Sequence, residues 1–407
     1  MRTVTLGASH LEVTPIAYGT WQFGGDWGPV DEQAAVAAIS GARSAGINFF
    51  DTAQAYGFGR SERLLGRALK AELRSARDSV VIATKGGLRM DGDRLVRDAS
   101  PAWLRKGVEV SLEALGTDYI DLYQVHWPDP ATPIGETAAA LAELVREGLI
   151  RHVGVSNYTT EQITEFAAVL PAETVQPPYH LFRRDIEAGL LPYARAQHIG
   201  VLAYGPLAHG LLGGAITGTT TFGADDWRSH SPAFTGPGFR RNLQVVAAPG
   251  RSAADRGATI AQLAVAWVLA HPAVQVAIVG AHPTSSAGKR RSPRSGAEPG
   301  RPGRNRQHHG RSGAARRPLS GRHDMTTIQP LRAARRPGEL PCPHRPRCPS
   351  ALAHDSSGAR TMASHPEQGW SLLCNGVVIF DDGGALLPGG RAVPPPPASA
   401  RTVAPAA

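Results

Sequence analysis

Eight short β-rich runs alternate with amphipathic helical stretches in the first 283 residues, and this alternation limits the fold more than any other feature of the chain. Strands that alternate with helical patterns of about 10–15 residues form βαβ units, whose strands run parallel. Eight of them favour a closed (β/α)8 TIM barrel in the α/β class. The runs are IAYGT (16–20), INFFDTA (47–53), VVIATK (80–85), YIDLYQVH (119–126), HVGVSN (152–157), TVQPPY (174–179), GVLAYG (200–205) and QVAIVG (275–280).

Turn and cap residues support this arrangement. TVTL (3–6) and LEVTPI (11–16) flank a turn-forming GASH, which predicts an N-terminal hairpin that plugs the bottom of the barrel. Ser100–Pro101 is typical of a helix start and Gly116 of a helix end. Pro249–Gly250, within VVAAPGRSAADRG (245–257), puts a helical turn at this position in doubt. A doubly wound sheet is the alternative, but the chain has neither a GxGxxG after its first strand nor a P-loop.

One connection is unusually long, since about fifty residues (207–257) separate the seventh strand from its helix. Connections of this length in compact domains are usually functional. This one carries Phe222, Trp227, Phe234 and Phe239. We expect it to fold over a ligand as a lid.

The composition changes abruptly after Pro283. Residues 284–407 carry 19 Lys and Arg against 7 Asp and Glu, 17 of the 33 prolines and all three cysteines, while 24 basic and 27 acidic residues remain in 1–283. The Arg/Pro/Gly-rich tail cannot bury enough apolar surface to offset its chain entropy. We therefore expect a barrel domain over 1–283 and a disordered tail over 284–407, with SLLCNGVVIFDD (371–382) as its one apolar island.

The same distribution excludes several classes of protein. The basicity lies in a tail without interleaved aromatic residues, so we expect no nucleic-acid partner. A cysteine-free body excludes a disulfide framework or a thiolate metal site there. The N-terminus lacks the apolar core of a secretory signal, and the longest apolar stretch (260–270) is too short for a membrane span. We expect a cytoplasmic protein that binds no membrane.

Four chemistry-bearing residues fall at the carboxyl ends of predicted strands, where a parallel barrel places its active site. Asp51, Lys85 and His126 end the second, third and fourth strands, and Tyr56 follows Asp51. A nearby ammonium can lower the pKa of a phenol, which is ordinarily about 10, and a carboxylate can hold that ammonium in place. The set suits proton donation to a carbonyl oxygen that His126 orients. It contains no nucleophile–base pair and no metal triad, so a hydride would need an external donor.

The segment DTAQAYGFGRSERLLGRAL (51–69) resembles the signature DTAxxYGxGxSExxLGxAL of the aldo-keto reductases. The resemblance covers about residues 1–282 and implies a (β/α)8 barrel and an NADPH-dependent reductase of small carbonyl compounds, with NADH as the alternative donor. It also implies a monomer. Further family blocks occur in the right order: GTWQFGG (19–25), IATKGG (82–87), LYQVHWPD (122–129), VGVSNYT (153–159), AYGPLAHGLL (203–212) and AQLAVAWVLAHPAV (261–274).

The resemblance assigns roles to individual residues. It implies a catalytic tetrad, a group that holds the nicotinamide, a stretch along the pyrophosphate and a substrate pocket, and no metal site. Four histidines show no partner pattern, and we interpret them as structural or solvent-facing: His152, His180, His198 and His209. The tetrad is Asp51, Tyr56, Lys85 and His126, and the group that holds the nicotinamide is Ser156, Asn157, Gln176 and Tyr204. The stretch along the pyrophosphate is Gly205, Pro206, Leu207 and Leu211, and Gly280 matches the loop after the last strand. The substrate pocket is lined by Trp21, Tyr56 and Trp127.

The resemblance ends at Gly280 and Ala281. In the family, a Gly-Ala-Arg loop and a helix that grips the adenosine 2′-phosphate follow the eighth strand, so we expect the eighth helix to be missing or replaced here. The abrupt loss of pattern resembles a high-GC gene translated in the wrong frame, and a genuine disordered extension is the alternative. Three functions stay open: an active reductase, a cofactor-binding regulatory subunit, or an inactive product with a truncated barrel.

Overall fold

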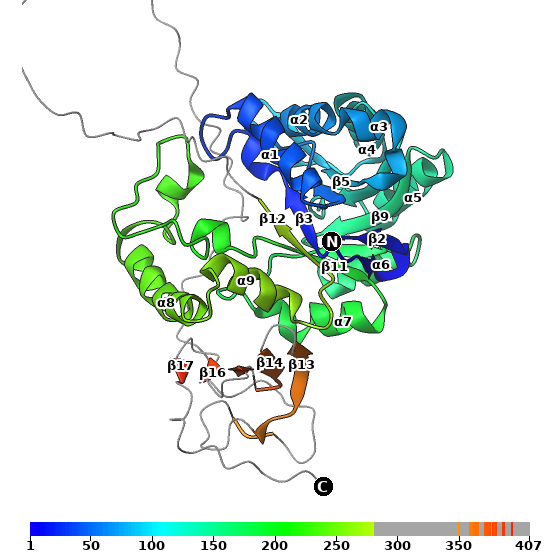
Figure 1. The fold of residues 1–407 in the computed structure, drawn as a ribbon. Coiled ribbons are helices and arrows are strands. Elements are labelled where there is room, and N and C mark those ends of the chain that lie inside the picture. Colours follow the sequence, from blue (N-terminus) through cyan, green and yellow to red (C-terminus); the bar gives the residue numbers. More distant parts are fainter. Residues whose placement is uncertain are drawn as a thin grey trace, which may run out of the picture.

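A closed barrel of eight parallel strands forms the centre of the computed structural model, as the alternation predicts (Figure 1). The structure describes residues 1–280, 348–350, 358–365, 370–375, 377–380, 385–386 and 392–393. The strands follow one another around the barrel in chain order, and the last closes it by pairing with the first. They are β3 (Ile16–Gly19), β4 (Phe49–Asp51), β5 (Val81–Gly86), β8 (Ile120–Val125), β9 (Ile150–Ser156), β10 (Thr174–Gln176), β11 (Gly200–Tyr204) and β12 (Val276–Val279).

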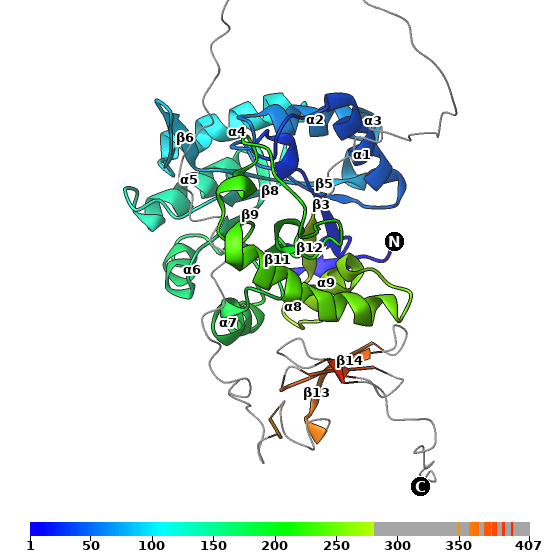
Figure 2. The ribbon, with the colours of Figure 1, turned by 90° about the vertical axis from the view of Figure 1, so that its left-hand side faces the viewer.

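Helices cover the outside of the barrel (Figure 2). The expected caps form: the Ser100 side chain accepts a hydrogen bond from the Trp103 amide, and Gly116 takes a left-handed conformation after the last turn of the same helix. The helices are α1 (Glu32–Ser44), α2 (Arg60–Ala68), α3 (Lys70–Ser75), α4 (Pro101–Leu115), α5 (Ile134–Arg146), α6 (Thr160–Ala167), α7 (Leu190–Ala196), α8 (Gly236–Ala254) and α9 (Ile260–Leu269).

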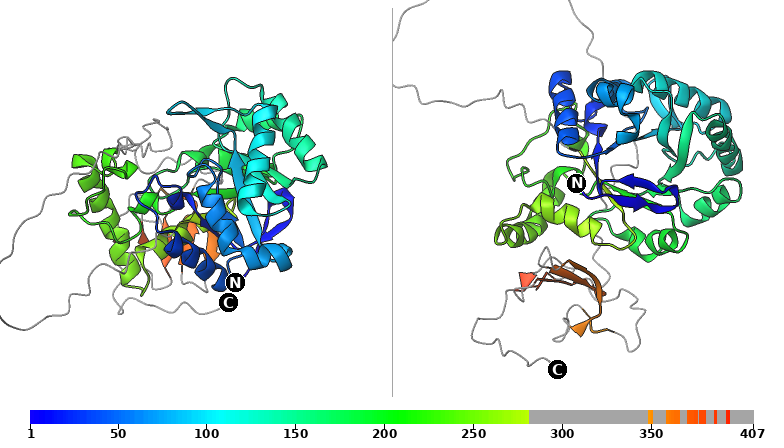
Figure 3. Two further views of the ribbon diagram at one scale, coloured as in Figure 1. Left: turned by 90° about the horizontal axis from the view of Figure 1, so that it is seen from above. Right: turned by 45° about the vertical axis from the view of Figure 1, so that its right-hand side comes forward.

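The N-terminal hairpin closes one end of the barrel, as predicted. Strand β1 (Val4–Leu6) pairs antiparallel with β2 (Leu11–Val13), and the pair lies across the barrel (Figure 3, right). Leu6 and Val13 are fully buried in one apolar cluster with barrel residues such as Phe49. At Gly7, which has φ +54°, a Cβ atom would lie 2.2 Å from the amide nitrogen of Gly200, so only glycine permits this approach.

Two elements differ from the sequence-based expectation. Helix α8 continues through Pro249 to Ala254 instead of breaking, and Pro249 itself is buried. Burial of Phe239, Pro249 and Ala253 outweighs the backbone hydrogen bond that proline removes. A second hairpin, β6 (Leu88–Asp91) with β7 (Arg94–Arg97), interrupts the connection between β5 and α4, and the alternation did not predict it.

Part of the C-terminal segment forms regular secondary structure, although we expected disorder after residue 283. Five strands form an antiparallel sheet, and Leu373 and Val377 from the apolar island are buried together with Ala359. The expected replacement of the eighth helix falls within 281–347, outside the described residues. The strands are β13 (Thr361–His365), β14 (Trp370–Leu373), β15 (Val378–Phe380), β16 (Ala385–Leu386) and β17 (Ala392–Val393).

Within the described residues, no helix combines the length and apolar character that crossing a membrane requires.

Candidate active site

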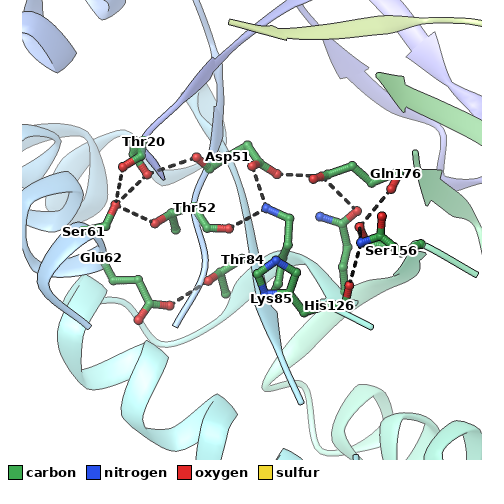
Figure 4. A network of polar contacts seen from close by, with 12 residues as sticks. Thr20, Asp51, Thr52, Ser61, Glu62, Thr84, Lys85, His126, Ser156 and Gln176 are labelled. Atoms are coloured by element: carbon green, nitrogen blue, oxygen red, sulfur yellow. Dashed lines mark hydrogen bonds and ion pairs between the residues drawn. The ribbon is translucent and has the colours of Figure 1, made fainter. Parts of the chain in front are cut away.

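The structure brings three of the four predicted catalytic residues together at the carboxyl ends of β4, β5 and β8. Asp51 ends β4, Lys85 lies near the end of β5, and His126 directly follows β8; each is at most 4% exposed. The Lys85 Nζ donates hydrogen bonds to Asp51 Oδ1 at 2.6 Å and to the Thr52 carbonyl at 2.8 Å (Figure 4). Asp51 and Lys85 thus form a buried, hydrogen-bonded ion pair.

Tyr56, the fourth predicted residue, completes this cluster from the loop after β4. Its ring centroid lies 5.3 Å from the Lys85 Nζ, and it meets the His126 imidazole edge to face with centroids 5.8 Å apart. The next residue, Gly57, has φ +66°, and a Cβ there would lie 2.5 Å from the Gly24 carbonyl oxygen. Glycine at 57 therefore lets the loop carrying Tyr56 pack against the loop after β3.

The electrostatics around Tyr56 differ from the expectation. Burial raises the pKa of the Tyr56 phenol well above its ordinary value, and the Asp51 carboxylate raises that pKa further. Burial lowers the pKa of Lys85, and Asp51 partly offsets this change. The Tyr56 pKa is thus raised instead of lowered, because the phenol is desolvated and close to a carboxylate. At neutral pH the phenol keeps its proton and can act as an acid.

A cavity of about 270 Å³ opens above this cluster. Asp51, Tyr56 and His126 line it, while Lys85 lies behind the wall. Two predicted site residues lie elsewhere: Leu211 is buried in the apolar cluster of the long connection, and the ring of Trp127 stacks under the Arg97 guanidinium. The other predicted lining residues are in the wall: Trp21, Ser156, Asn157, Gln176, Tyr204, Gly205, Pro206, Leu207 and Gly280.

One side of the cavity is polar and already hydrogen-bonded. The Ser156 Oγ donates to the Gln176 carbonyl at 2.8 Å, and the Asn157 Nδ2 donates to the His126 carbonyl at 3.0 Å. The Tyr204 hydroxyl donates to Asn157 Oδ1 at 3.0 Å. These contacts fix the ends of β9, β10 and β11 relative to His126.

The Gln176 side chain connects this polar side to the ion pair. Its Nε2 donates to the second carboxylate oxygen of Asp51 at 2.8 Å and to Gln124 Oε1 at 3.3 Å (Figure 4). Nothing in the local sequence around Gln176 or Gln124 indicates this contact, because the two residues lie on different strands and 125 positions separate Gln176 from Asp51.

The opposite side is an aromatic wall that sequence reasoning found only in part. Trp227, from the long connection, stacks on Trp21 with centroids 6.1 Å apart, and Trp27 meets both rings edge to face. A β-bridge between Trp27 and Asp226 joins the connection to the loop after β3, which supports the expectation that it covers a ligand site. The unpredicted lining residues include two with basic side chains, Arg228 and His209.

Neither of these two polar residues offers a free positive charge. The Arg228 guanidinium pairs with Asp226 at 2.6 Å, and burial lowers the pKa of His209 to about 4, so its imidazole is neutral at pH 7. In the part of the chain that the structure describes, there is also no cluster of three or more His, Cys, Asp or Glu side chains suited to a metal ion.

Comparison with known proteins agrees with this geometry. The model of the aldo/keto reductase family matches residues 15–287. The chain belongs to the aldo/keto reductase family. It is 44% identical over 283 residues to aldo-keto reductase YhdN of Bacillus subtilis, covering 69% of this chain and 85% of the relative. It is 36% identical to the NADH-specific methylglyoxal reductase of Escherichia coli, covering 66% and 86%.

Solved structures of aldo/keto reductases are also similar. The glycerol dehydrogenase AKR11B4 from Gluconobacter oxydans matches with a TM-score of 0.62 and 43% identity, covering 69% of this chain and 86% of that one. AKR11C1 from Bacillus halodurans matches with a TM-score of 0.57 and 28% identity over the same shares. The protein is therefore an NAD(P)H-dependent oxidoreductase with an aldo/keto reductase barrel.

The C-terminal segment has a match of its own. Residues 342–398 match the model of a family of unknown function (DUF5999). Translation in the wrong frame and a genuine extension both stay predictions for the tail. The reductase family model ends at residue 287 and this second model begins at residue 342, so neither match covers the residues between them.

Proposed function

We propose that this protein reduces the carbonyl group of a small aldehyde or ketone to an alcohol, with Tyr56 as the proton donor. The single observation that carries the proposal is the buried Lys85–Asp51 ion pair beside the Tyr56 ring, which lines the cavity together with Asp51. A structural ion pair would not need a phenol and an imidazole in contact with each other above it.

The cavity fits a nicotinamide cofactor. Its polar side presents a serine, an asparagine and a glutamine near the Tyr204 ring, which suits a planar ring that carries an amide. At Gly280, a Cβ would lie 2.7 Å from Gln22 Oε1, so glycine at this position accommodates the Gln22 side chain in the same wall. Ser156, Asn157, Gln176 and Tyr204 would hold the nicotinamide, and Gly205, Pro206 and Leu207 would lie along the phosphates. When bound, the cofactor supplies the hydride.

The residues of the tetrad then have separate roles. His126 orients the carbonyl oxygen toward Tyr56, and the Tyr56 hydroxyl donates the proton that the new alcohol needs. Lys85 provides positive charge behind the phenol, and Asp51 compensates for the desolvation of that charge. Because burial raises the pKa of the Tyr56 phenol, the phenol holds its proton at neutral pH and can donate it to the carbonyl oxygen.

The aromatic wall supplies the substrate side of the cavity. Trp21, Trp27 and Tyr56 would contact the substrate, and neither Arg228 nor His209 presents a free charge to it. We therefore expect neutral carbonyl compounds to be better substrates than those that carry a carboxylate. NADPH is the proposed donor; relatives named for NADH and for NADP(+) both occur. We also propose that the enzyme is a cytoplasmic monomer.

A carbonyl panel followed by the loss of NADPH and NADH absorbance tests the proposal. The panel pairs 4-nitrobenzaldehyde with 4-carboxybenzaldehyde and methylglyoxal with glyoxylate, so that each pair compares a neutral and a charged substrate. We expect turnover of the neutral member of each pair, with a higher kcat/KM. A protein that binds the cofactor but reduces no carbonyl would support the alternative of a cofactor-binding regulatory subunit.

A further inference from the structure

Gln124 lies in the barrel interior beside the ion pair, although the proposed mechanism gives it no role. It is fully buried on β8, and the strand register places it opposite Lys85 of β5 on one side and opposite Gly154 of β9 on the other. A Cβ at Gly154 would lie 3.1 Å from the Gln124 Cγ, so the missing side chain at 154 leaves the space that Gln124 occupies.

Hydrogen-bond chemistry fixes the orientation of the two amides. An ionised carboxylate only accepts hydrogen bonds, so the Gln176 NH₂ group must face Asp51, to which it donates at 2.8 Å. The second hydrogen of that NH₂ group is directed at Gln124, at 3.3 Å, which places the Gln124 Oε1 toward Gln176. With both hydrogens directed inward, the carbonyl oxygen of Gln176 is left on the cavity side of its amide, in a wall that Gln176 lines.

This orientation leaves a buried donor unused. The Nε2 of Gln124 has no hydrogen-bond partner among the described residues. A buried amide donor without a partner destabilises a fold, and an apolar side chain of similar size would avoid that penalty. Stability alone therefore does not favour a polar side chain at position 124. Its hydrogen bond is accepted from the Gln176 amide, which also donates to Asp51.

We infer that Gln124 is a positioning residue for the reaction: it holds the Gln176 amide, which fixes the Asp51 carboxylate that pairs with Lys85. Gln124 lines no part of the cavity, so it touches neither substrate nor cofactor and acts only through Gln176. The inference rests on the proposed function for its effect on turnover. Its effects on stability and on cofactor binding do not depend on that function.

The test uses Gln124→Met in the full chain, because methionine matches glutamine in length and lacks the acceptor. We expect kcat at saturating substrate to fall about three- to ten-fold, the loss of one oriented hydrogen bond, with KM for the carbonyl unchanged within twofold. The Kd for NADPH, from quenching of tryptophan fluorescence, should rise about two- to ten-fold because the Gln176 amide is then held by Asp51 alone and is less strictly oriented. The unfolding midpoint in urea should stay the same or rise.

Three comparisons make the result decisive. Thr174→Val is the matched control, because Thr174 of β10 is also fully buried and its hydroxyl has no hydrogen-bond partner in the described structure. This variant should leave kcat and Kd unchanged. Gln124→Asn, too short to reach Gln176, should repeat the loss if the methionine variant folds poorly. The double variant Gln124→Met/Gln176→Met should be no slower than Gln176→Met alone, because both residues act on Asp51 through one contact.

A Gln124→Met protein with wild-type kcat and Kd, or losses that multiply in the double variant, would overturn the inference. A lower unfolding midpoint together with the fall in kcat would reduce Gln124 to a structural residue. If the wild-type chain reduced no carbonyl, the proposed function would fail instead, and the Kd comparison would still decide the role of Gln124 in holding Gln176.

Discussion

Replacing Lys85 by methionine should destabilise the barrel far more than removing a surface charge does, and a second substitution should reverse most of the effect. Lys85 and Asp51 are 1% and 3% exposed, and the Lys85 Nζ lies 2.6 Å from Asp51 Oδ1. Lys85→Met leaves Asp51 with one donor, Gln176, and no opposite charge. Removing one partner of a buried pair costs about 3–5 kcal/mol, because the remaining charge stays desolvated.

The double variant Lys85→Met/Asp51→Asn separates this desolvation from the loss of packing. It removes the uncompensated charge and keeps both side-chain volumes, so it should recover all but about 1–2 kcal/mol of the loss. Urea unfolding at pH 7, followed by tryptophan fluorescence, gives the three free energies of unfolding. Neither variant should reduce carbonyls. A single variant within about 1 kcal/mol of wild type, or a double variant as unstable as the single one, would refute the electrostatic reasoning.

Three further predictions follow from the site and its surroundings. Tyr56→Phe should lower kcat more than a hundredfold and leave the Kd for the cofactor within threefold, because only the proton donor is lost; a drop of less than tenfold would remove Tyr56 from that role. Burial lowers the pKa of His180 to about 3. The unfolded chain therefore binds a proton near pH 6.5 that the native chain does not bind, and the free energy of unfolding falls as the pH drops below that value. At pH 5 this loss is about 2 kcal/mol, and His180→Asn should remove it from a urea titration at pH 7 and pH 5. Gly57→Ala should destabilise the protein by about 1–3 kcal/mol, because residue 57 combines φ +66° with backbone contact at Gly24; an unchanged unfolding midpoint would contradict the close approach of the two loops.

The barrel, and the clustering of Asp51, Lys85 and His126 at its carboxyl end, could be predicted from the sequence for the same physical reason. In a parallel barrel, strand period and chain order determine which residues reach the carboxyl end, so Asp51, Lys85 and His126 could be placed from local patterns alone. The hairpin over Leu88–Arg97 was missed because it inserts two extra strands between a barrel strand and its helix, and the alternation of strands and helices does not predict such an insertion. Proline has a low local helix propensity, so the sequence put helix α8 in doubt at Pro249. Burial in the folded protein keeps the helix continuous, and local propensity does not report that burial.

The contacts between distant segments could not be predicted in this way. The aromatic wall forms because Trp27 and Trp227 meet across a bridge between two loops that are about 200 residues apart in the chain. Likewise, Gln176 was assigned to the cofactor by resemblance, and its contact with Asp51 follows only from the closed barrel. The direction of the Tyr56 pKa was also wrong, because it depends on burial that a sequence pattern does not report.

The last prediction concerns the cofactor end of the site, where the reductase pattern is lost after Ala281. Four residues that we propose hold the nicotinamide line the cavity: Ser156, Asn157, Gln176 and Tyr204. The residues that grip the adenosine 2′-phosphate in the family have no counterpart in the sequence that follows. Each charge-assisted hydrogen bond to a phosphate contributes about 1.5–3 kcal/mol, so losing one or two weakens binding by roughly ten- to several thousand-fold. The chain should therefore bind NADPH weakly and discriminate little between NADPH and NADH, and a family-like loop and helix grafted after Gly280 should restore both properties. Fluorescence titration of both proteins with both cofactors measures this. Tight, NADPH-selective binding by the native chain would show that residues such as Arg290 or Arg291 supply the phosphate contacts instead.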